Sequence, residues 1–440
     1  MKLNYKRTFF IGLAFLSISA FWQMYDNIIP LILQNTFGIK ESVSGVIMSL
    51  DNVLAVFLLP LIGGLSDKVD TKWGKRTPFV VLGTIAAIIC MMLMPLADAN
   101  KQMILFVVAL GLTLIAMAMY RSPAVALMPD LTPKPLRSAA NAVINLMGAI
   151  GGVYTLVLIK TLVAKGERPS YLPVFIGVAA MMLLSIIILV LTIKEKLLAK
   201  QIAEEYPEDA SSSANIEACA NNEASDTSKT SSDSAKLPKD VKRSLVFILV
   251  SIFLWFAAYN AVTTAFSRYA VKVWKLEGGG FADCLLVATI AAIISYIPIG
   301  ILASKFGRKK MIIAGLFMML TSFCAVFFYP TYHFSANIFF ALIGMGWASI
   351  GVNSLPMVVE MSKNSDLGKY TGLYYTFSMS AQIFTPIASG ALLQYVSYNT
   401  LFPYAIFFTV CAIITMSMVK HGDSKPERKK KIIENFDVED

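Results

Sequence analysis

The stretch PLIGGLSDKVDTKWGKRTPF at residues 60–79 links two apolar blocks, and PIGILASKFGRKKM at residues 298–311 does the same further along the chain. Both contain Gly-x-Leu followed by a glycine and two basic residues, at 63–65 with 74–76 and at 300–302 with 307–309. The same residue types thus recur in the same order on both sides of the midpoint of the chain. The sequence therefore predicts two structurally related halves.

Apolar residues dominate the chain of 440 residues: 56% are hydrophobic and 15% are charged, against about 45–50% and about 25% in soluble domains. They fall into blocks of roughly 20 residues, the length of a helix that crosses a bilayer. The twelve blocks are 8–36, 42–65, 78–97, 102–128, 137–163, 171–194, 244–270, 281–303, 311–329, 335–359, 370–395 and 400–419. We predict an all-α polytopic membrane protein with twelve transmembrane helices in two six-helix bundles.

Residues 196–242 interrupt this pattern with a segment rich in Ser, Ala, Asn and Asp. Such a composition is typical of a disordered linker. The sequence therefore predicts a first bundle at 1–195, a cytoplasmic linker at 196–242, a second bundle at 243–420 and a cytoplasmic tail at 421–440. The first apolar block has no cleavage-site pattern after it, so we expect a retained helix rather than a signal peptide.

Lys and Arg gather in alternate connections, near 2–7, 68–76, 134–137, 305–310 and 363–369. Basic residues favour the cytoplasmic side of a membrane, so both termini are predicted to be cytoplasmic. The net charge of +10 then indicates contact with the bilayer of the plasma or inner membrane and not with nucleic acid. We expect a monomer.

Residue types that support enzymatic chemistry are sparse. The five cysteines lack metal-binding spacing, both histidines lie outside the apolar blocks, and the chain has no nucleotide-binding loop. The sequence predicts no enzyme, cofactor or metal centre. Proton chemistry within the membrane would have to use carboxylates.

Asp26 lies in the middle of the first apolar block, where an ionised side chain costs about 2.5–3.5 kcal/mol. Gln23, Asn27 and Gln34 follow the same broad helical stripe, and Trp22 lies one turn before Asp26. Carboxylate and amide groups can bind sugar hydroxyls, and an indole can cover an apolar sugar face. The stripe is therefore either a sugar site or a polar patch between helices.

Asp51 and Arg121 are the other charged candidates within the first half. If the first two helices are neighbours, Asp51 and Asp26 share a cavity in which one of them exchanges a proton or both ligate Na⁺. Asp51 can instead make a helix–helix hydrogen bond. Arg121 either pairs with a carboxylate that has lost its proton or extends to the inner interface.

Further polar and aromatic side chains form stripes on other predicted helices. Each stripe either faces the substrate or belongs to helix packing and interface anchoring. These candidates are Asn141, Asn145, Trp255, Tyr259, Asn260, Trp347, Asn353, Tyr375 and Gln382. No charged residue is expected deep in the blocks 244–270, 311–329, 370–395 and 400–419, so ion coupling is expected to reside in the first bundle.

The two loop stretches and an acidic residue after the fourth block are predicted to form a gate. Asp67 would interact with the N-terminal dipole of the helix at 370–395 when the inner side closes. Lys75 and Arg76 would pair with Asp130. The complete set of gate residues is Gly63, Asp67, Lys75, Arg76, Asp130, Gly300 and Arg308.

The Gly63-x-Leu65-x-Asp67 stretch with its basic run resembles the loop signature of the major facilitator superfamily. The longer form TKWGKRTPF at 71–79 resembles the glycoside–pentoside–hexuronide:cation symporter group. PLIGGLSD, ALMPDLTP at 126–133 and DNIIPLILQ at 26–34 are similar to sucrose transporters and their animal and bacterial relatives. Plant sucrose transporters carry an acid in the fourth helix, which this chain lacks, so the coupling role is assigned here to Asp26 and Asp51.

This resemblance implies uptake of a small sugar, a glycoside or disaccharide, with H⁺ or Na⁺ by alternating access. One alternative is efflux of amphipathic molecules. Exporters of this superfamily usually carry Gly-Pro in the fifth helix, and MGAIGGVY at 147–154 does not contain it. A second alternative is a membrane sensor that transports nothing.

Overall fold

The computed structural model describes residues 3–133, 136–166, 169–205, 239–361 and 367–423, and within them the chain is helical and forms no β-strand. The first half contains α1 (Tyr5–Asn35), α2 (Glu41–Lys68), α3 (Thr77–Ala99), α4 (Met103–Asp130), α5 (Arg137–Leu162), α6 (Leu172–Thr192) and the short α7 (Glu195–Glu205). The second half contains α9 (Lys239–Lys272), α10 (Ala282–Phe306), α11 (Arg308–Phe327), α12 (Ala336–Glu360), α13 (Leu367–Tyr395), the 3-10 turn η3 (Tyr398–Thr400) and α14 (Leu401–Ser417).

Twelve long helices in these ranges correspond to the twelve predicted blocks. Eleven of them are long and apolar enough to cross a membrane, and α13, a helix of 29 residues, is the twelfth. The all-α polytopic prediction is confirmed.

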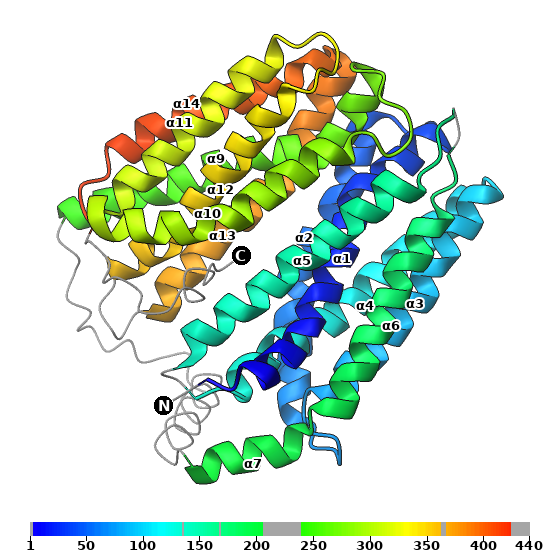
Figure 1. The fold of residues 1–440 in the computed structure, drawn as a ribbon, viewed down its shortest axis with the longest axis vertical. Helices are drawn as coiled ribbons and strands as arrows, with labels where there is room; N and C mark the ends of the chain where they lie inside the picture. Colours follow the sequence, from blue (N-terminus) through cyan, green and yellow to red (C-terminus); the bar gives the residue numbers. More distant parts are fainter. Residues whose placement is uncertain (1–2, 134–135, 167–168, 206–238, 362–366, 424–440) are drawn as a thin grey trace, which may run out of the picture.

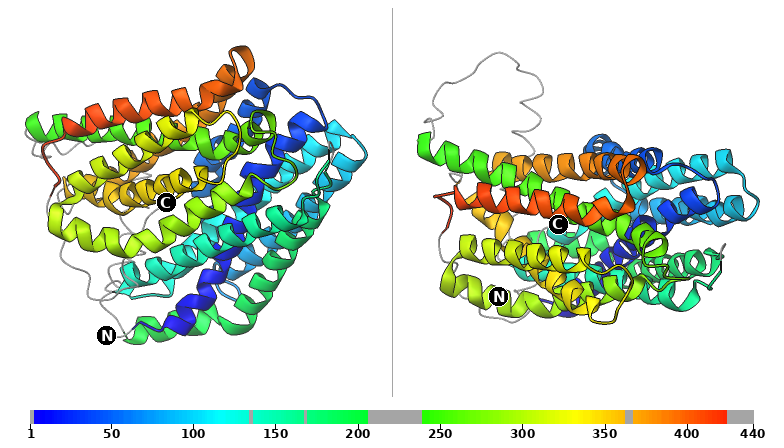
Figure 2. Two further views of the ribbon diagram at one scale, coloured as in Figure 1. Left: turned by 45° about the horizontal axis from the view of Figure 1, so that its top comes forward. Right: turned by 90° about the horizontal axis from the view of Figure 1, so that it is seen from above.

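The helices form two bundles that lie side by side (Figures 1 and 2). In the first bundle α1 packs on α5 and α6, and α3 packs on α4; in the second, α12 packs on α10 and α11, and α9 packs on α13 and α14. The bundles meet where α2 packs on α13, α5 on α10 and α1 on α9. The first, second and fifth long helices of each bundle thus form the interface. Two structurally related halves are expected to use equivalent helices in this way.

We call the side at which α1 begins, and which carries α7, the near side, and the opposite side the far side. The bundles converge at the far side and diverge toward the near side (Figure 1). Close backbone approach helps this convergence, because a methyl group at Gly45 of α2 would overlap the Pro386 carbonyl of α13. An alanine at position 45 would force the two helices apart.

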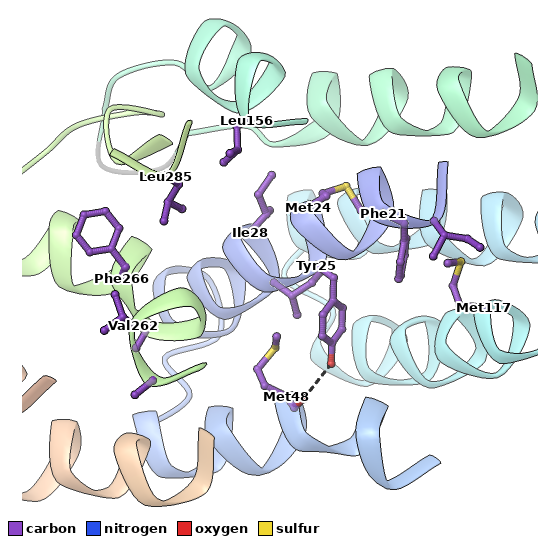
Figure 3. Packing of buried hydrophobic residues seen from close by; sticks show 14 of the residues in the cluster. Phe21, Met24, Tyr25, Ile28, Met48, Met117, Leu156, Val262, Phe266 and Leu285 are labelled. Carbon is purple, nitrogen blue, oxygen red and sulfur yellow. Dashed lines mark hydrogen bonds between the residues drawn. The ribbon is translucent and has the colours of Figure 1, made fainter. Parts of the chain in front are cut away.

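A continuous apolar core surrounds α1 and crosses between the bundles (Figure 3). Phe21, Met24 and Ile28 are fully buried. The Tyr25 hydroxyl donates to the Met48 carbonyl at 3.5 Å, which links α1 to α2. Because these residues occupy the faces of α1 that do not carry Asp26, the helix presents its polar stripe in one direction.

The linker prediction differs from the structure at both of its ends. Residues 195–205 form α7, in which Leu198 and Ile202, one turn apart, pack against the core of the first bundle. The first residues of α9 occupy the other end, at 239–242. Apolar side chains at helical spacing outweigh the polar composition at 195–205, whereas 206–238 lie outside the described residues.

Candidate functional site

A central cavity of about 740 Å³ lies between the two bundles and extends toward the near side. Its lining comes from α1, α4 and α5 of the first bundle and from α10 and α13 of the second. Seven predicted site residues line it: Trp22, Gln23, Asp26, Arg121, Asn141, Asn145 and Tyr375. Arg137, Thr289 and Tyr296, which the sequence analysis did not select, also line it.

Two smaller pockets adjoin this cavity. The first, of about 240 Å³, is lined by Gln23, Asp26, Asn27, Tyr259 and Asn260, among others. The second, of about 250 Å³, is lined by Arg121, Trp255, Tyr259, Asn260, Trp347 and Gln382, among others. Because Asp26 and Arg121 each border the central cavity and one pocket, the three spaces form one candidate site.

The three charged candidates lie close enough for their charges to interact. Asp51 interacts electrostatically with Asp26 on one side and with Arg121 on the other. The Asn52 amide donates to Asp51 at 2.8 Å, and the Arg121 guanidinium lies 5.8 Å from the centre of the Trp22 ring. Asp51 itself does not line any of these three cavities.

Two predicted substrate residues lie outside these cavities. The Gln34 amide donates to the Tyr398 hydroxyl at the far side. Asn353 is buried, and its amide donates to the Ser349 carbonyl of its own helix at 2.8 Å. Both side chains therefore contribute to the framework of the protein in this structure.

The far side is closed by a buried ion pair that the sequence analysis missed. Arg268, near the end of α9, donates to Glu41, at the beginning of α2, at 2.6 Å, and their side chains are 3% and 4% exposed. The Tyr398 hydroxyl contacts both Glu41 and Gln34, and Ser44 also accepts from Arg268. The expectation that the block 244–270 holds no deep charge is thus wrong, because helix ends that look interfacial in sequence become buried where the bundles meet.

Two more polar links join the bundles at the far side. Lys160 of α5 pairs with Asp283 of α10 at 2.6 Å. On the other flank, the Ser42 hydroxyl of α2 donates to Gln394 of α13 at 2.5 Å. The far-side gate, defined as Glu41, Arg268 and Tyr398, therefore lies between two flanking contacts.

Among the described residues, the near-side ion pairs of Arg76 and Arg308 each lie within one bundle. Arg76 pairs with Asp67 and, at 2.9 Å, with Asp130, and it also contacts Ser66 and the Gly63 carbonyl. This confirms the Arg76–Asp130 contact, whereas the Lys75 backbone N–H donates to Glu195 at 2.7 Å.

In the second half, Arg308 pairs with Glu360 and Gly300 lies within α10. The contact between Asp67 and the beginning of α13 stays a prediction for the state in which the near side is closed.

An acidic residue after the sixth long helix of each bundle caps the third helix of that bundle. Glu195 accepts hydrogen bonds from the backbone N–H groups of Arg76 and Thr77, and Asp423 accepts one from Lys309 at the beginning of α11. Carboxylates are stabilised at helix N-termini by the helix dipole and the unpaired N–H groups. The sequence showed that the loop glycine and basic residues recur in both halves. It did not show that Glu195 and Asp423 bind the backbone at these two loops.

We expect Asp67→Asn to slow turnover while the stability of the protein changes by less than about 1 kcal/mol, because the Asp67 side chain is 49% exposed and exposed ion pairs contribute little. Turnover and thermal unfolding in detergent measure the two effects. Arg76→Lys is the control, since it loses the forked contacts of a buried guanidinium and is expected to lower the melting temperature. Normal turnover of Asp67→Asn would contradict a gating role.

No group of three or more His, Cys, Asp or Glu side chains arranged to hold a metal ion occurs in the part of the chain that the structure describes.

A family model for the Major Facilitator Superfamily matches residues 11–296 and 278–436. The chain belongs to this superfamily. Its fold agrees: a crystal structure of a mutant of the nucleoside transporter NupG superimposes with a TM-score of 0.68 at 15% identity, covering 95% of this chain and 100% of the other. The protein is therefore a multi-pass membrane transporter of the superfamily, and its central cavity lies between the two bundles.

Two plant proteins are similar in sequence to part of this superfamily member. The sucrose transport protein SUC4 of Arabidopsis thaliana is 30% identical over 131 residues, which are 26% of this chain and 26% of the relative. SUC3 of the same plant is 26% identical over 151 residues, 30% of this chain and 25% of the relative. The matches thus span about a quarter of the length of each curated relative.

Proposed function

We propose that the protein is a glycoside:cation symporter that carries a small neutral sugar together with H⁺ or Na⁺ by alternating access. The observation that carries this proposal is Asp26, which lines the cavity between the bundles beside Trp22 and Gln23. A carboxylate and an amide supply hydrogen bonds for sugar hydroxyls, and the indole supplies an apolar surface. The partial likeness to sucrose transport proteins favours the same substrate class.

Asp26 and Asp51 are the proposed coupling groups. Both carboxylates lie within membrane-spanning helices, their charges interact, and Arg121 is near Asp51. Intramembrane carboxylates typically mark proton or ion pathways. Loss of a bound cation from Asp26 would leave a negative charge that is costly to enclose, so the ion-free carrier would keep the site open to water.

The conformation of the protein supports alternating access with the near side open. Ion pairs join the two bundles at the far side, and the near-side pairs of Arg76 and Arg308 stay within one bundle. We propose that the near side is cytoplasmic, because its loops are rich in basic residues, and that this conformation is the inward-open state. We propose that breaking the far-side gate accompanies the opposite state.

Transport in proteoliposomes tests the function. Radiolabelled sucrose, maltose and methyl glucoside are offered under a proton gradient without Na⁺, or under a Na⁺ gradient at equal pH. We expect one gradient to drive accumulation of at least one of these sugars, and counterflow of that sugar without any gradient. Protein-free liposomes are the control, and absence of counterflow for every sugar would overturn the assignment.

A further inference from the structure

The pocket of about 250 Å³, here named the second-bundle pocket, is built mainly by α9, α12 and α13. Its volume lies below the range of about 300–1,000 Å³ that holds a drug-sized ligand. It is therefore suited to one ring of a ligand and not to a whole disaccharide. The central cavity next to it has the room for the remainder.

Aromatic rings form a rigid wall of this pocket. Tyr259 and Trp347 stack in parallel, with ring centres 3.8 Å apart and an angle of 3° between the planes. Phe256 supports Trp347 edge-on at 5.1 Å. Such a wall contacts the apolar C–H groups of a sugar ring without losing conformational freedom on binding.

Two buried N–H donors at this pocket lack a hydrogen-bond partner within the described residues. They are Trp255 Nε1, on a fully buried side chain, and Asn260 Nδ2. A buried donor without a partner is unfavourable, because it has lost its bonds to water, and an indole N–H can only donate. The ligand that satisfies them must bring acceptor oxygens to an apolar wall, which is the chemistry of a glycosyl ring.

A comparable buried donor lies on the other side of the bundle interface. Trp22 Nε1 of α1 is also buried without a partner in the described chain, and Trp22 lines the central cavity. Arg121 borders both the central cavity and the second-bundle pocket. A ligand with two rings can therefore contact the donors of both bundles at once.

We propose that the second-bundle pocket is a subsite for one ring of a glycoside with two or more rings, whose other ring lies against Trp22. This inference rests on the proposed function and names its substrate class. A single-ring sugar occupies only one of the two positions, so it binds more weakly and connects the bundles less firmly.

Trp255→Phe tests the subsite, because it removes the N–H and keeps an aromatic ring. We expect the KM for sucrose to rise about threefold to tenfold, the value of one lost hydrogen bond, with the KM for methyl glucoside changed less. The smaller ring leaves a cavity, so the melting temperature should fall, but by less than in a tryptophan variant that also loses an internal hydrogen bond. Asn260→Leu provides a second variant with the same expectation.

Trp274→Phe is the matched control. The Trp274 indole donates to the Tyr329 carbonyl at 3.0 Å, away from the pocket, so its loss should lower stability and leave the preference for sucrose over methyl glucoside unchanged. Equal KM values for the two sugars in the wild-type protein, or an unchanged preference in Trp255→Phe and Asn260→Leu, would overturn the subsite while sugar transport stands. Absence of transport of sucrose, maltose and methyl glucoside alike by the wild-type protein would overturn the proposed function and the subsite together.

Discussion

Arg268→Met is expected to shift the transporter toward a state that is open at the far side. The substitution leaves Glu41 buried without its cation, and breaking a buried pair in this way costs about 3–5 kcal/mol. The cost applies only to the closed far side, because Glu41 becomes hydrated when the bundles separate there. A bias of this size changes the ratio of the two states by more than a hundredfold.

Cysteine labelling measures the shift. In a variant whose five native cysteines are replaced, Leu285→Cys reports access near the far side and Val125→Cys reports access to the central cavity near the opposite side. Arg268→Met should speed labelling at position 285 at least tenfold and slow it at position 125.

The double variant Glu41→Gln with Arg268→Met is the control. It removes both charges, and it should return both labelling rates toward those of the wild-type protein. Equal rates in all variants would contradict a gate at Glu41 and Arg268.

Asp26→Asn is expected to abolish accumulation of sugar while exchange continues. The amide has the shape of the carboxylate but a fixed neutral state, so it mimics the form that carries a cation. A membrane potential of 100 mV supplies about 2.3 kcal/mol per charge, which corresponds to roughly fiftyfold accumulation. The variant should lose this ratio entirely, because binding of the ion no longer decides when the loaded site can close.

Uptake under an ion gradient and counterflow without one separate the two effects of this substitution. Asp51→Asn is the matched comparison, since Asp51 interacts with Asp26 but does not line the cavities. We expect a smaller loss of sugar accumulation in Asp51→Asn if Asp51 acts only through its charge interaction with Asp26. If Asp51 binds the ion itself, the loss should equal that of Asp26→Asn. Accumulation by Asp26→Asn against a gradient would show that Asp26 is not the coupling residue.

Much of the architecture was predictable from local pattern. Helices that cross a bilayer must satisfy every backbone hydrogen bond internally and present apolar side chains outward, so each one leaves a block of about 20 apolar residues in the sequence. The similar loop stretches around Gly63 and Gly300 predicted that the chain has two structurally related halves. Asp26 stood out for a related reason, since a carboxylate within an apolar block has few explanations other than function.

The gate and the arrangement of the site depended on contacts between residues far apart in the chain. Glu41 and Arg268 look like ordinary charges at helix ends, and 227 residues separate them. Gln34 and Asn353 follow the same helical stripes as true cavity residues but are held by Tyr398 and Ser349. The sequence by itself determined which segments are helical and which carry charge into the membrane. Only the packing of one bundle against the other decided which polar side chains face the cavity and which close the far side, because burial at that interface is a property of both halves together.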